Sequence, residues 1–239
     1  HAGDVIETHL VETEPSDGIL PRPVPFSVVY EDDDILVVDK PADTPIHPSI
    51  GNYENTLANG IAWYFEQKGE PFVYRCINRL DRDTTGLIVL AKHALSAAVL
   101  SQAMRSREIH RTYQAFALGE TAASGTIDAP IARLDGSLIQ RTVDFASGER
   151  SVTHYRTLAH CSVFSHLELN LETGRTHQIR VHMAYIGHPL LGDTLYNKTP
   201  GTFPRQALHS ASLSFVHPIT GEPLNFHAPL PEDMQNLLT

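Results

Sequence analysis

The alternation of apolar and polar residues along the chain predicts many short strands and few helices. Two apolar runs, residues 28–31 and 35–40, flank an acidic turn, which predicts a β-hairpin. Residues 166–172 read H-L-E-L-N-L-E, so one face of that strand carries three leucines toward a core. Apolar residues at helical spacing predict helices over residues 56–67, 94–105 and 176–186, and a short helix is expected near the C-terminus.

Two of these helices carry apolar residues near helical spacing. In the helix over residues 94–105 the residues near helical spacing are Leu95, Val99 and Met104. In the helix over residues 176–186 they are Ile179, Met183 and Ile186. Further strands are predicted over residues 87–91, 112–118, 126–131, 138–143, 151–158, 208–216 and 224–226. Hairpin-linked strands with a few helices favour the α+β class, with a mixed, largely antiparallel sheet flanked by helices.

The domain organisation follows from composition. Residues 1–27 are polar and rich in proline, which predicts an extended N-terminal arm. Residues 28–239 contain no internal repeat and no linker, so we expect one domain there.

Net charge, apolar runs and cysteine spacing indicate which partners and which compartment to expect. The formal net charge of −10 argues mildly against nucleic acid as a partner, although arginines gather around the candidate motifs below. The acidic residues 31–34 predict a solvated turn. No apolar run could span a membrane, and the first residues lack the pattern of a secretory signal. Cys76 and Cys161 lack metal-type spacing, which predicts reduced, packed thiols in a cytoplasmic protein.

The strongest chemical signal is the segment N-R-L-D-R-D-T-T-G-L-I, residues 78–88. It places Asp81 between Arg79 and Arg82, just before a Thr-Thr-Gly turn and an apolar strand. Nearby guanidinium groups favour the charged form of a carboxylate, so Asp81 is expected to be an ionised nucleophile or base in a positive setting. That combination suits chemistry on a polyanion.

A second basic segment, residues 174–193, begins G-R-T-H-Q-I-R-V-H. Arg175, Gln178 and Arg180 offer donors near the start of a helix, where the helix dipole also favours anions.

Four segments together resemble the RluA-type pseudouridine synthases. Residues 79–87 resemble the motif R-L-D-x-x-T-[ST]-G-L, and residues 174–182 resemble G-R-x-H-Q-[IL]-R-x-H, with G-H-P-L-L-G-D following. Residues 111–115 resemble K-x-Y-x-A with Arg111 in place of lysine, and residues 40–48 resemble K-P-x-G-x-x-x-H-P. The matches share the family's order and span about two thirds of the chain.

The resemblance implies an α+β pseudouridine synthase fold with a central active-site cleft, and a cofactor-free isomerisation of uridine in RNA. It implies Asp81 as the catalytic carboxylate acting on a flipped-out uridine, Tyr113 stacking on the base and assisting proton removal, and Arg180 pairing with Asp81. Arg79 is expected to fill the vacated space or hold the flipped nucleotide. Substrate contacts are expected from Arg79, Arg82, Thr85, Arg111, Arg175, His177 and Gln178.

The resemblance leaves the RNA undecided between rRNA and tRNA, with a lean toward a small structured target such as a tRNA arm. A stand-alone catalytic domain is expected, because the N-terminal arm is too short for the S4-like module of larger relatives. We also expect a monomer.

Other functional classes would need other residues. Fourteen histidines invite a metal site, but no H-E-x-x-H occurs and His177 and His182 are five residues apart, so none is expected. The sequence contains no phosphate-binding glycine loop, so no nucleotide cofactor is expected. A non-catalytic RNA-binding protein on the same scaffold is the alternative from another class. A hydrolase is a weaker alternative, because it would need a second carboxylate or a metal near Asp81.

Overall fold

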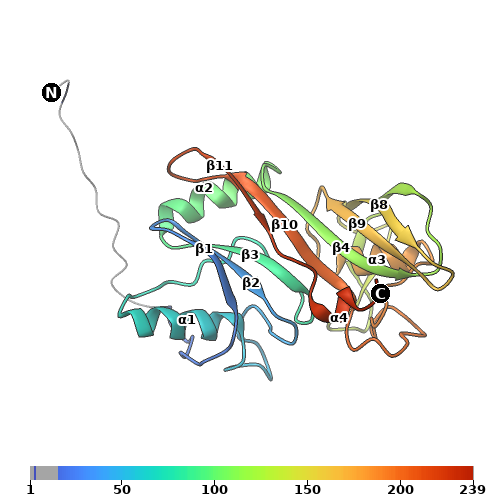
Figure 1. Ribbon diagram of the computed structural model, residues 1–239, viewed down its shortest axis with the longest axis horizontal. Coiled ribbons are helices and arrows are strands. Elements are labelled where there is room, and N and C mark those ends of the chain that lie inside the picture. The colour runs from blue at the N-terminus through green and yellow to red at the C-terminus, as the bar shows by residue number, and fades with distance from the viewer. Residues whose placement is uncertain (1–2, 4–15, 239) are drawn as a thin grey trace.

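A nine-stranded mixed sheet forms the centre of the protein in the computed structural model, which describes residue 3 and residues 16–238 (Figure 1). The strand order is β1-β2-β3-β10-β4-β9-β8-β5, with β11 paired to β10. The strands are β1 (Ser27–Glu31), β2 (Ile35–Lys40), β3 (Thr85–Ala91), β4 (His110–Leu118), β5 (Ser124–Asp128), β8 (Val152–His160), β9 (Phe164–Leu171), β10 (Leu208–Val216) and β11 (Pro223–His227). Among the described strands only β3 and β10 pair in parallel, so the predicted α+β class with a largely antiparallel sheet is confirmed.

Helices cover both faces of this sheet. They are α1 (Leu57–Lys68), α2 (Ala94–Arg105), α3 (Gln178–Tyr185) and the short α4 (Glu232–Gln235). A separate hairpin is formed by β6 (Ile131–Arg133) and β7 (Arg141–Val143). Helices α1 and α3 pack on the same face at different ends of the sheet, while α2 packs on the other face (Figure 1). The candidate site is lined by three segments: the loop before β3, the turn from α2 into β4, and the connection from β9 to α3.

Strand β2 shows why both faces are covered. Leu36 and Val38 belong to the core shared with α1 and α3, whereas Ile35 and Val37 belong to the core shared with α2. All four side chains are fully buried, and each such burial stabilises the fold by about 1.5–3 kcal/mol. Every residue of the neighbouring β3 is buried as well, so the strand that follows Asp81 is a rigid support.

Gly86 allows this central strand to approach its parallel neighbour. Its φ of 110° lies in the region that favours glycine, and a Cβ atom there would lie 2.3 Å from the Ser210 oxygen of β10. The glycine of the Thr-Thr-Gly turn is therefore needed by the sheet itself.

The predicted boundaries agree best with the structure where the apolar pattern is long. Helix α2 and strand β10 have the predicted bounds, and Ile179, Met183 and Ile186 face the core from α3 as expected. The three leucines of β9 also face this core. The strand predicted over residues 126–131 is divided, because β5 ends before Pro130, which has no N–H to donate, and β6 begins after it. Of residues 138–143, only 141–143 form a strand.

Two of the three apolar residues near helical spacing in α2 lie outside its buried face. Leu95 is 49% exposed and Val99 is 39% exposed. The buried residues are Ser96 and Leu100, because the helix approaches β3 through a stripe rich in small side chains that apolar periodicity does not detect. Met104 does pack against this core.

The acidic turn was predicted to be solvated, but two of its carboxylates form contacts within the protein. Glu31 accepts hydrogen bonds from Tyr64 and Lys68 of α1 and from Lys92, at 2.6, 2.7 and 3.0 Å. Asp34 pairs with His93 at 2.7 Å.

The prediction of packed thiols was wrong in part, because Cys161 is exposed. Cys76 does pack against the core, and burial raises its pKa to about 12.

Part of the predicted arm lies against α1. The Asn59 amide donates to the Leu20 oxygen at 2.8 Å, and the Arg22 backbone N–H donates to the Asn59 oxygen at 3.1 Å. Residues 1–2 and 4–15 of the predicted arm lie outside the described residues. Within the described part of the chain, no helix has the length and apolar character to cross a bilayer.

Candidate active site

Asp81 lies on a tight loop between α1 and β3. The loop is anchored to the sheet by Asn78, which is 3% exposed: its amide donates to the Leu87 oxygen at 3.1 Å and accepts from the Val89 N–H at 2.8 Å. The Thr84 N–H donates to the Asp81 backbone oxygen at 3.1 Å, which closes the turn. This local bonding holds Asp81 in one position beside the rigid central strand.

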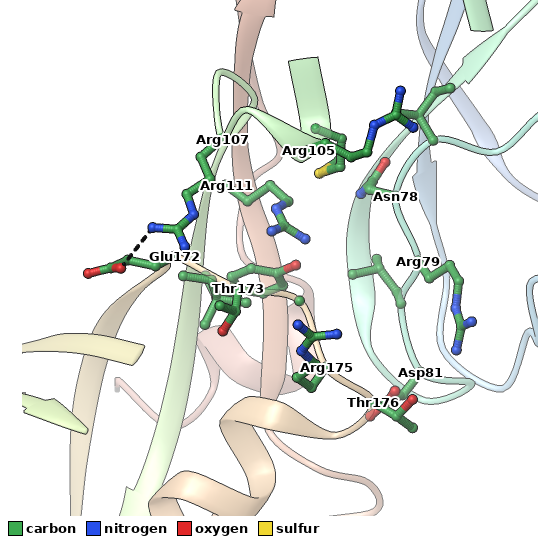
Figure 2. A pocket seen from close by; sticks show the side chains of 16 residues that line it. Asn78, Arg79, Asp81, Arg105, Arg107, Arg111, Glu172, Thr173, Arg175 and Thr176 are labelled. Atoms are coloured by element: carbon green, nitrogen blue, oxygen red, sulfur yellow. Dashed lines mark hydrogen bonds and ion pairs between the residues drawn. The ribbon is translucent and has the colours of Figure 1, made fainter. Parts of the chain in front are cut away.

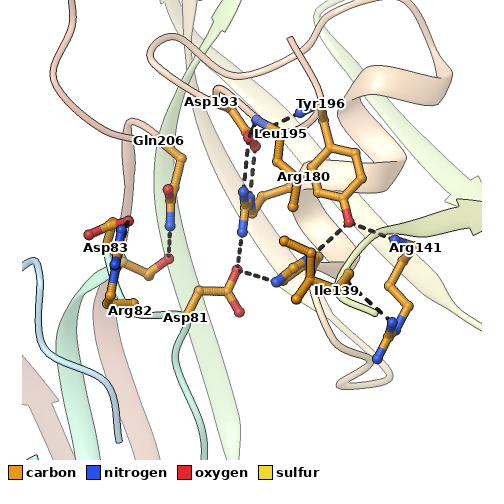
Figure 3. A network of polar contacts seen from close by, with 12 residues as sticks. Asp81, Arg82, Asp83, Ile139, Arg141, Arg180, Asp193, Leu195, Tyr196 and Gln206 are labelled. Atoms are coloured by element: carbon orange, nitrogen blue, oxygen red, sulfur yellow. Dashed lines mark hydrogen bonds and ion pairs between the residues drawn. The ribbon is translucent and has the colours of Figure 1, made fainter. Parts of the chain in front are cut away.

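Arg180 of α3 meets Asp81 across 99 residues of sequence. Its Nη1 donates to Asp81 Oδ2 at 2.9 Å, while Nε and Nη2 donate to the two oxygens of the fully buried Asp193 at 2.7 and 2.9 Å (Figure 3). Burial opposes the charged form, yet Asp193 and Asp81 together raise the pKa of Arg180 above its ordinary value. The guanidinium therefore stays charged and points one donor at Asp81.

His177 and Tyr196 complete the wall beside this pair. His177 Nε2 lies 3.9 Å from Asp81 Oδ2, and its Nδ1 lies 2.7 Å from the Tyr196 hydroxyl. Burial lowers the pKa of His177 despite the opposing effect of Asp81, so the imidazole is mainly neutral at pH 7. The Tyr196 ring lies under the Arg180 guanidinium, with the carbon Cζ 5.1 Å from the ring centroid.

A pocket of about 440 Å³ opens in front of Asp81 (Figure 2). Three segments line it: the loop before β3, the turn from α2 into β4, and the connection from β9 to α3. Tyr113 is 4% exposed, lines the pocket and makes no hydrogen bond through its hydroxyl with another described residue. The basic residues of the wall are Arg79, Arg105, Arg107, Arg111 and Arg175.

Two buried basic side chains, Lys40 and Arg205, hold the Asp81 loop from behind. Lys40 is fully buried, and its Nζ donates to the backbone oxygens of Pro41 and Arg82 at 2.8 Å each. Burial lowers the pKa of Lys40 to about 7. Arg205 donates from Nη1 to the Asp83 oxygen at 3.1 Å and forms a two-pronged pair with Asp233 of α4 at 2.7 and 2.9 Å.

The structure brings most of the predicted site residues together. Asp81, Tyr113, Arg79 and Arg175 line both the main pocket and a small adjoining one. Arg111 lines the main pocket, and His177, Gln178 and Arg180 line the adjoining one.

Three of the predicted substrate contacts are engaged elsewhere. Arg82 turns away from Asp81 toward the carboxylate of Asp83 (Figure 3). It also lies 3.5 Å from the Asp43 carboxylate. The Thr85 hydroxyl lies 2.8 Å from His209 Nδ1, behind the loop. Gln178 is buried, and both ends of its amide bond to protein groups near Val152 and Thr173, so it shapes the β9–α3 connection.

Sequence reasoning assigned no role to Asp193, Tyr196 or Arg205. Asp193 was visible only as the last residue of the G-H-P-L-L-G-D match, and its contact with Arg180 depends on how the chain after α3 folds back. Tyr196 and Arg205 carried no signal in the sequence pattern.

No second carboxylate of the described chain is free beside Asp81. Asp193 is fully buried and engaged by Arg180, and Glu172 pairs with Arg107, Arg150 and His154. A group that could offer metal ligands, Asp32, Asp34 and His217, lies at the β1–β2 turn rather than at this pocket.

A carboxylate with a fixed arginine partner, at the mouth of an arginine-lined pocket on a mixed sheet, suits chemistry on a polyanion. Residues 34–185 match the family model of RNA pseudouridylate synthases. The chain belongs to this family.

Relatives agree over nearly the whole chain. An uncharacterised RNA pseudouridine synthase of Bacillus subtilis, YjbO, is 43% identical over 99% of this chain and 83% of its own length. The ribosomal large subunit pseudouridine synthase D of Vibrio cholerae is 43% identical over 97% of this chain and 75% of its own. Among solved structures, human RNA pseudouridylate synthase domain containing 1 superposes with a TM-score of 0.71 at 26% identity, covering 91% of this chain and 86% of its own.

Proposed function

We propose that this protein isomerises particular uridines of a structured RNA to pseudouridine, with Asp81 as the catalytic carboxylate. The observation that carries the proposal is the Asp81–Arg180–Asp193 arrangement at the mouth of the arginine-lined pocket. A uridine must leave its stack to reach Asp81, at a cost of a few kcal/mol that is smallest for an unpaired nucleotide. The arginines that line the pocket offset that cost by binding phosphate.

The reaction breaks the C1′–N1 bond, turns the uracil in place and forms a C1′–C5 bond. The proton leaves C5, and N1 gains a proton, so no oxidant, reductant or water is consumed. Asp81 acts as nucleophile or base, with Arg180 pairing with its carboxylate and directing it into the pocket. Neutral His177 lies beside that carboxylate and holds no competing charge.

Tyr113 is the residue that supports the base. It lines the pocket beside Asp81, and its hydroxyl is not occupied by another described residue. Its ring can stack on the uracil, and its hydroxyl can assist removal of the C5 proton. Arg79 lines the same pocket from the Asp81 loop and would hold the flipped nucleotide or fill its place in the stack.

The alternatives lose support at the site. A non-catalytic RNA-binding protein would not need a charged carboxylate fixed by a buried arginine, since that arrangement costs desolvation energy. A hydrolase would need a group to activate water, and the carboxylates nearest Asp81 among the described residues are engaged by arginines.

The RNA itself is proposed from the relatives. Large-subunit ribosomal RNA is favoured over a tRNA arm, because the Vibrio cholerae relative named for the ribosomal large subunit matches almost the whole chain. We also propose that the protein acts as a monomer, since one chain supplies all the groups described at the site. We propose the cytoplasm as its compartment.

Release of tritium from RNA labelled at C5 of uridine tests the proposal. Labelled rRNA and tRNA are assayed separately with the wild type, with Asp81→Asn and with Asp83→Asn as a matched control whose carboxylate pairs with Arg82 instead. Release that Asp83→Asn retains and Asp81→Asn loses, at unchanged RNA affinity, supports the assignment. Residual release above a few per cent in Asp81→Asn would overturn the role of Asp81.

A further inference from the structure

The pocket in front of Asp81 has a second end built from the turn between α2 and β4. Asp81 and Thr176 lie at one end of the pocket, Arg105 and Arg107 lie at the other, and the Arg111 guanidinium lies between them (Figure 2). The nucleotide base is accounted for at the Asp81 end. The arginine end takes no part in the bond changes proposed above, and no particular phosphate has been assigned to it.

Arg111 carries an unsatisfied donor. Its Nε is the one buried side-chain nitrogen or oxygen without a hydrogen-bond partner among the residues that the structure describes. No carboxylate of the described chain lies within ion-pair distance of it, unlike Arg107, Arg150, Arg156, Arg175, Arg180 and Arg205. A partly buried guanidinium without an anion is costly, so an anion supplied from outside would stabilise it.

The neighbouring positions keep this guanidinium open to a ligand. Gly174 faces it, and a Cβ there would lie 3.2 Å from Arg111 Nη1, so a larger residue would crowd the group. Arg105 is exposed, and it donates from Nη2 to the neutral side-chain oxygen of Gln102 at 2.8 Å, which leaves its charge uncompensated.

Arg107 stands where the chain would favour glycine. It follows the end of α2 with a φ of 63°, and the Glu108 N–H bonds back to the Ala103 oxygen at 2.9 Å, as in a glycine-terminated helix. An arginine in this left-handed conformation is strained. Its side chain pairs with Glu172 at 3.1 Å and holds that carboxylate at the edge of the pocket.

We propose that Arg105 and Arg111 bind one phosphodiester of the RNA strand, next to the nucleotide that enters at Asp81. A phosphate fits because the guanidinium fork matches its oxygens and supplies strong charge-assisted hydrogen bonds. This inference rests on the proposed function for the identity of the ligand, and adds where the strand continues beyond the flipped base.

The test measures RNA binding and turnover separately. Arg111→Gln, Arg105→Gln and the double variant are compared with Arg156→Gln in filter binding to rRNA and tRNA and in tritium release. Arg156 is a matched control, because it pairs with Glu168 across β8 and β9, and neither residue lines the pocket. Since Arg105 is exposed, its replacement does not threaten the fold.

We expect Arg111→Gln to raise Kd and KM by about 10-fold or more, because it removes a charge-assisted hydrogen bond to the RNA. The slope of log K against log salt should become shallower by about 0.7–0.9 for each phosphate that the variant no longer binds. A methylphosphonate placed next to the target uridine should weaken wild-type binding and have little further effect in the double variant. Arg156→Gln should behave as wild type.

The outcomes separate this inference from the function on which it rests. If the wild type releases tritium while both arginine variants keep wild-type Kd, KM and salt slope, the phosphate site is wrong and the proposed function stands. If no RNA releases tritium, the binding measurements still decide the phosphate site. Equal losses in Arg156→Gln would overturn the site as well, since they would show a general effect of charge.

Discussion

Arg180 carries two tasks with one side chain. Two of its nitrogens hold the fully buried Asp193, and the third points at Asp81, whose carboxylate is 23% exposed on the pocket side. The buried half of the arrangement fixes the geometry of the accessible half. We attribute this cost to the proposed reaction, which needs an oriented carboxylate.

Arg180→Met should lower both stability and catalysis. Removing the cation leaves Asp193 charged and buried, so the free energy of unfolding should fall by about 3–5 kcal/mol, measured by urea denaturation. Tritium release should fall to background, because Asp81 loses its partner. A variant as active as the wild type would contradict the pairing role.

A double variant and a surface pair serve as controls. Arg180→Met with Asp193→Leu removes the stranded charge and should recover much of the stability, yet remain inactive. Arg156→Met breaks an exposed pair with Glu168 and should cost only about 0–1 kcal/mol.

At the residue scale, sequence motifs pointed to Asp81 and Arg180. They gave no role to Asp193, whose partner depends on how the chain folds back. Asp81 and Arg180 were expected to pair, and they lie 2.9 Å apart. Arg82 shares the same motif but points to Asp83 and Asp43, because neighbours in a tight turn project in different directions. Asp193 is indispensable to the geometry, but which side chain it meets depends on the path of the chain after α3.

At the scale of elements, the C-terminal helix α4 is connected to the Asp81 loop. Asp233 of α4 holds Arg205, which is 7% exposed and donates to the Asp83 backbone oxygen. The Arg205 backbone also lies against Gly192, where a Cβ would come within 1.9 Å of the Arg205 oxygen. Gly192 precedes Asp193, so one segment braces both the Asp81 loop and the anchor of Arg180.

Asp233→Asn should therefore lower kcat rather than raise KM. Losing the two-pronged pair frees Arg205 and loosens the loop that carries Asp81, and a misplacement of about 1 Å can cost up to about 10²-fold in rate. We expect kcat to fall between about 10-fold and 10²-fold, with KM for RNA unchanged.

The adjacent Glu232→Gln is the matched control, because that carboxylate forms no ion pair with another described residue. It should keep wild-type kcat, and the thermal midpoints of both variants should be measured beside the kinetics. A fall in kcat of the same size in Glu232→Gln would argue for a general effect of the helix, and an unchanged kcat in Asp233→Asn would contradict the link.

Elements were predictable where one rule dominates. Strict alternation identified β9, and Thr56 with Asn59 forms the capping box where the first helix was expected to begin. The face of α2 was not predictable, because Ser96 and the alanines allow closer packing on β3 than Leu95 and Val99 would. Close packing depends on the partner surface, which periodicity within one helix does not describe.

At the scale of the whole molecule, the net charge of −10 and the arginine-lined pocket are compatible because the charges are segregated. Several carboxylates elsewhere join secondary-structure elements. Glu31 is the clearest case: it joins β1 to Tyr64 and Lys68 of α1 and to Lys92, which follows β3. Burial alone would raise the pKa of Glu31, but these hydrogen bonds lower it from 4.5 to about 2.

This shift predicts how acid destabilises the protein. A carboxyl whose pKa is lower in the folded state contributes stability that is complete above its unfolded value of 4.5 and is lost as the pH falls toward about 2. Glu31→Gln carries no charge at any pH. The difference in free energy of unfolding between wild type and Glu31→Gln should therefore be constant above about pH 5 and shrink steadily below it.

Urea titrations at a series of pH values from 7 down to about 2 measure this difference directly. Taking the difference between two proteins removes the contribution of every other carboxyl group, which both share. Glu66→Gln, an exposed position on α1, should follow the wild-type curve throughout, because surface changes without strong contacts alter stability little. A wild-type advantage over Glu31→Gln that is the same at pH 3 as at pH 6 would mean that shape and packing, rather than the charge on Glu31, hold β1, α1 and the end of β3 together.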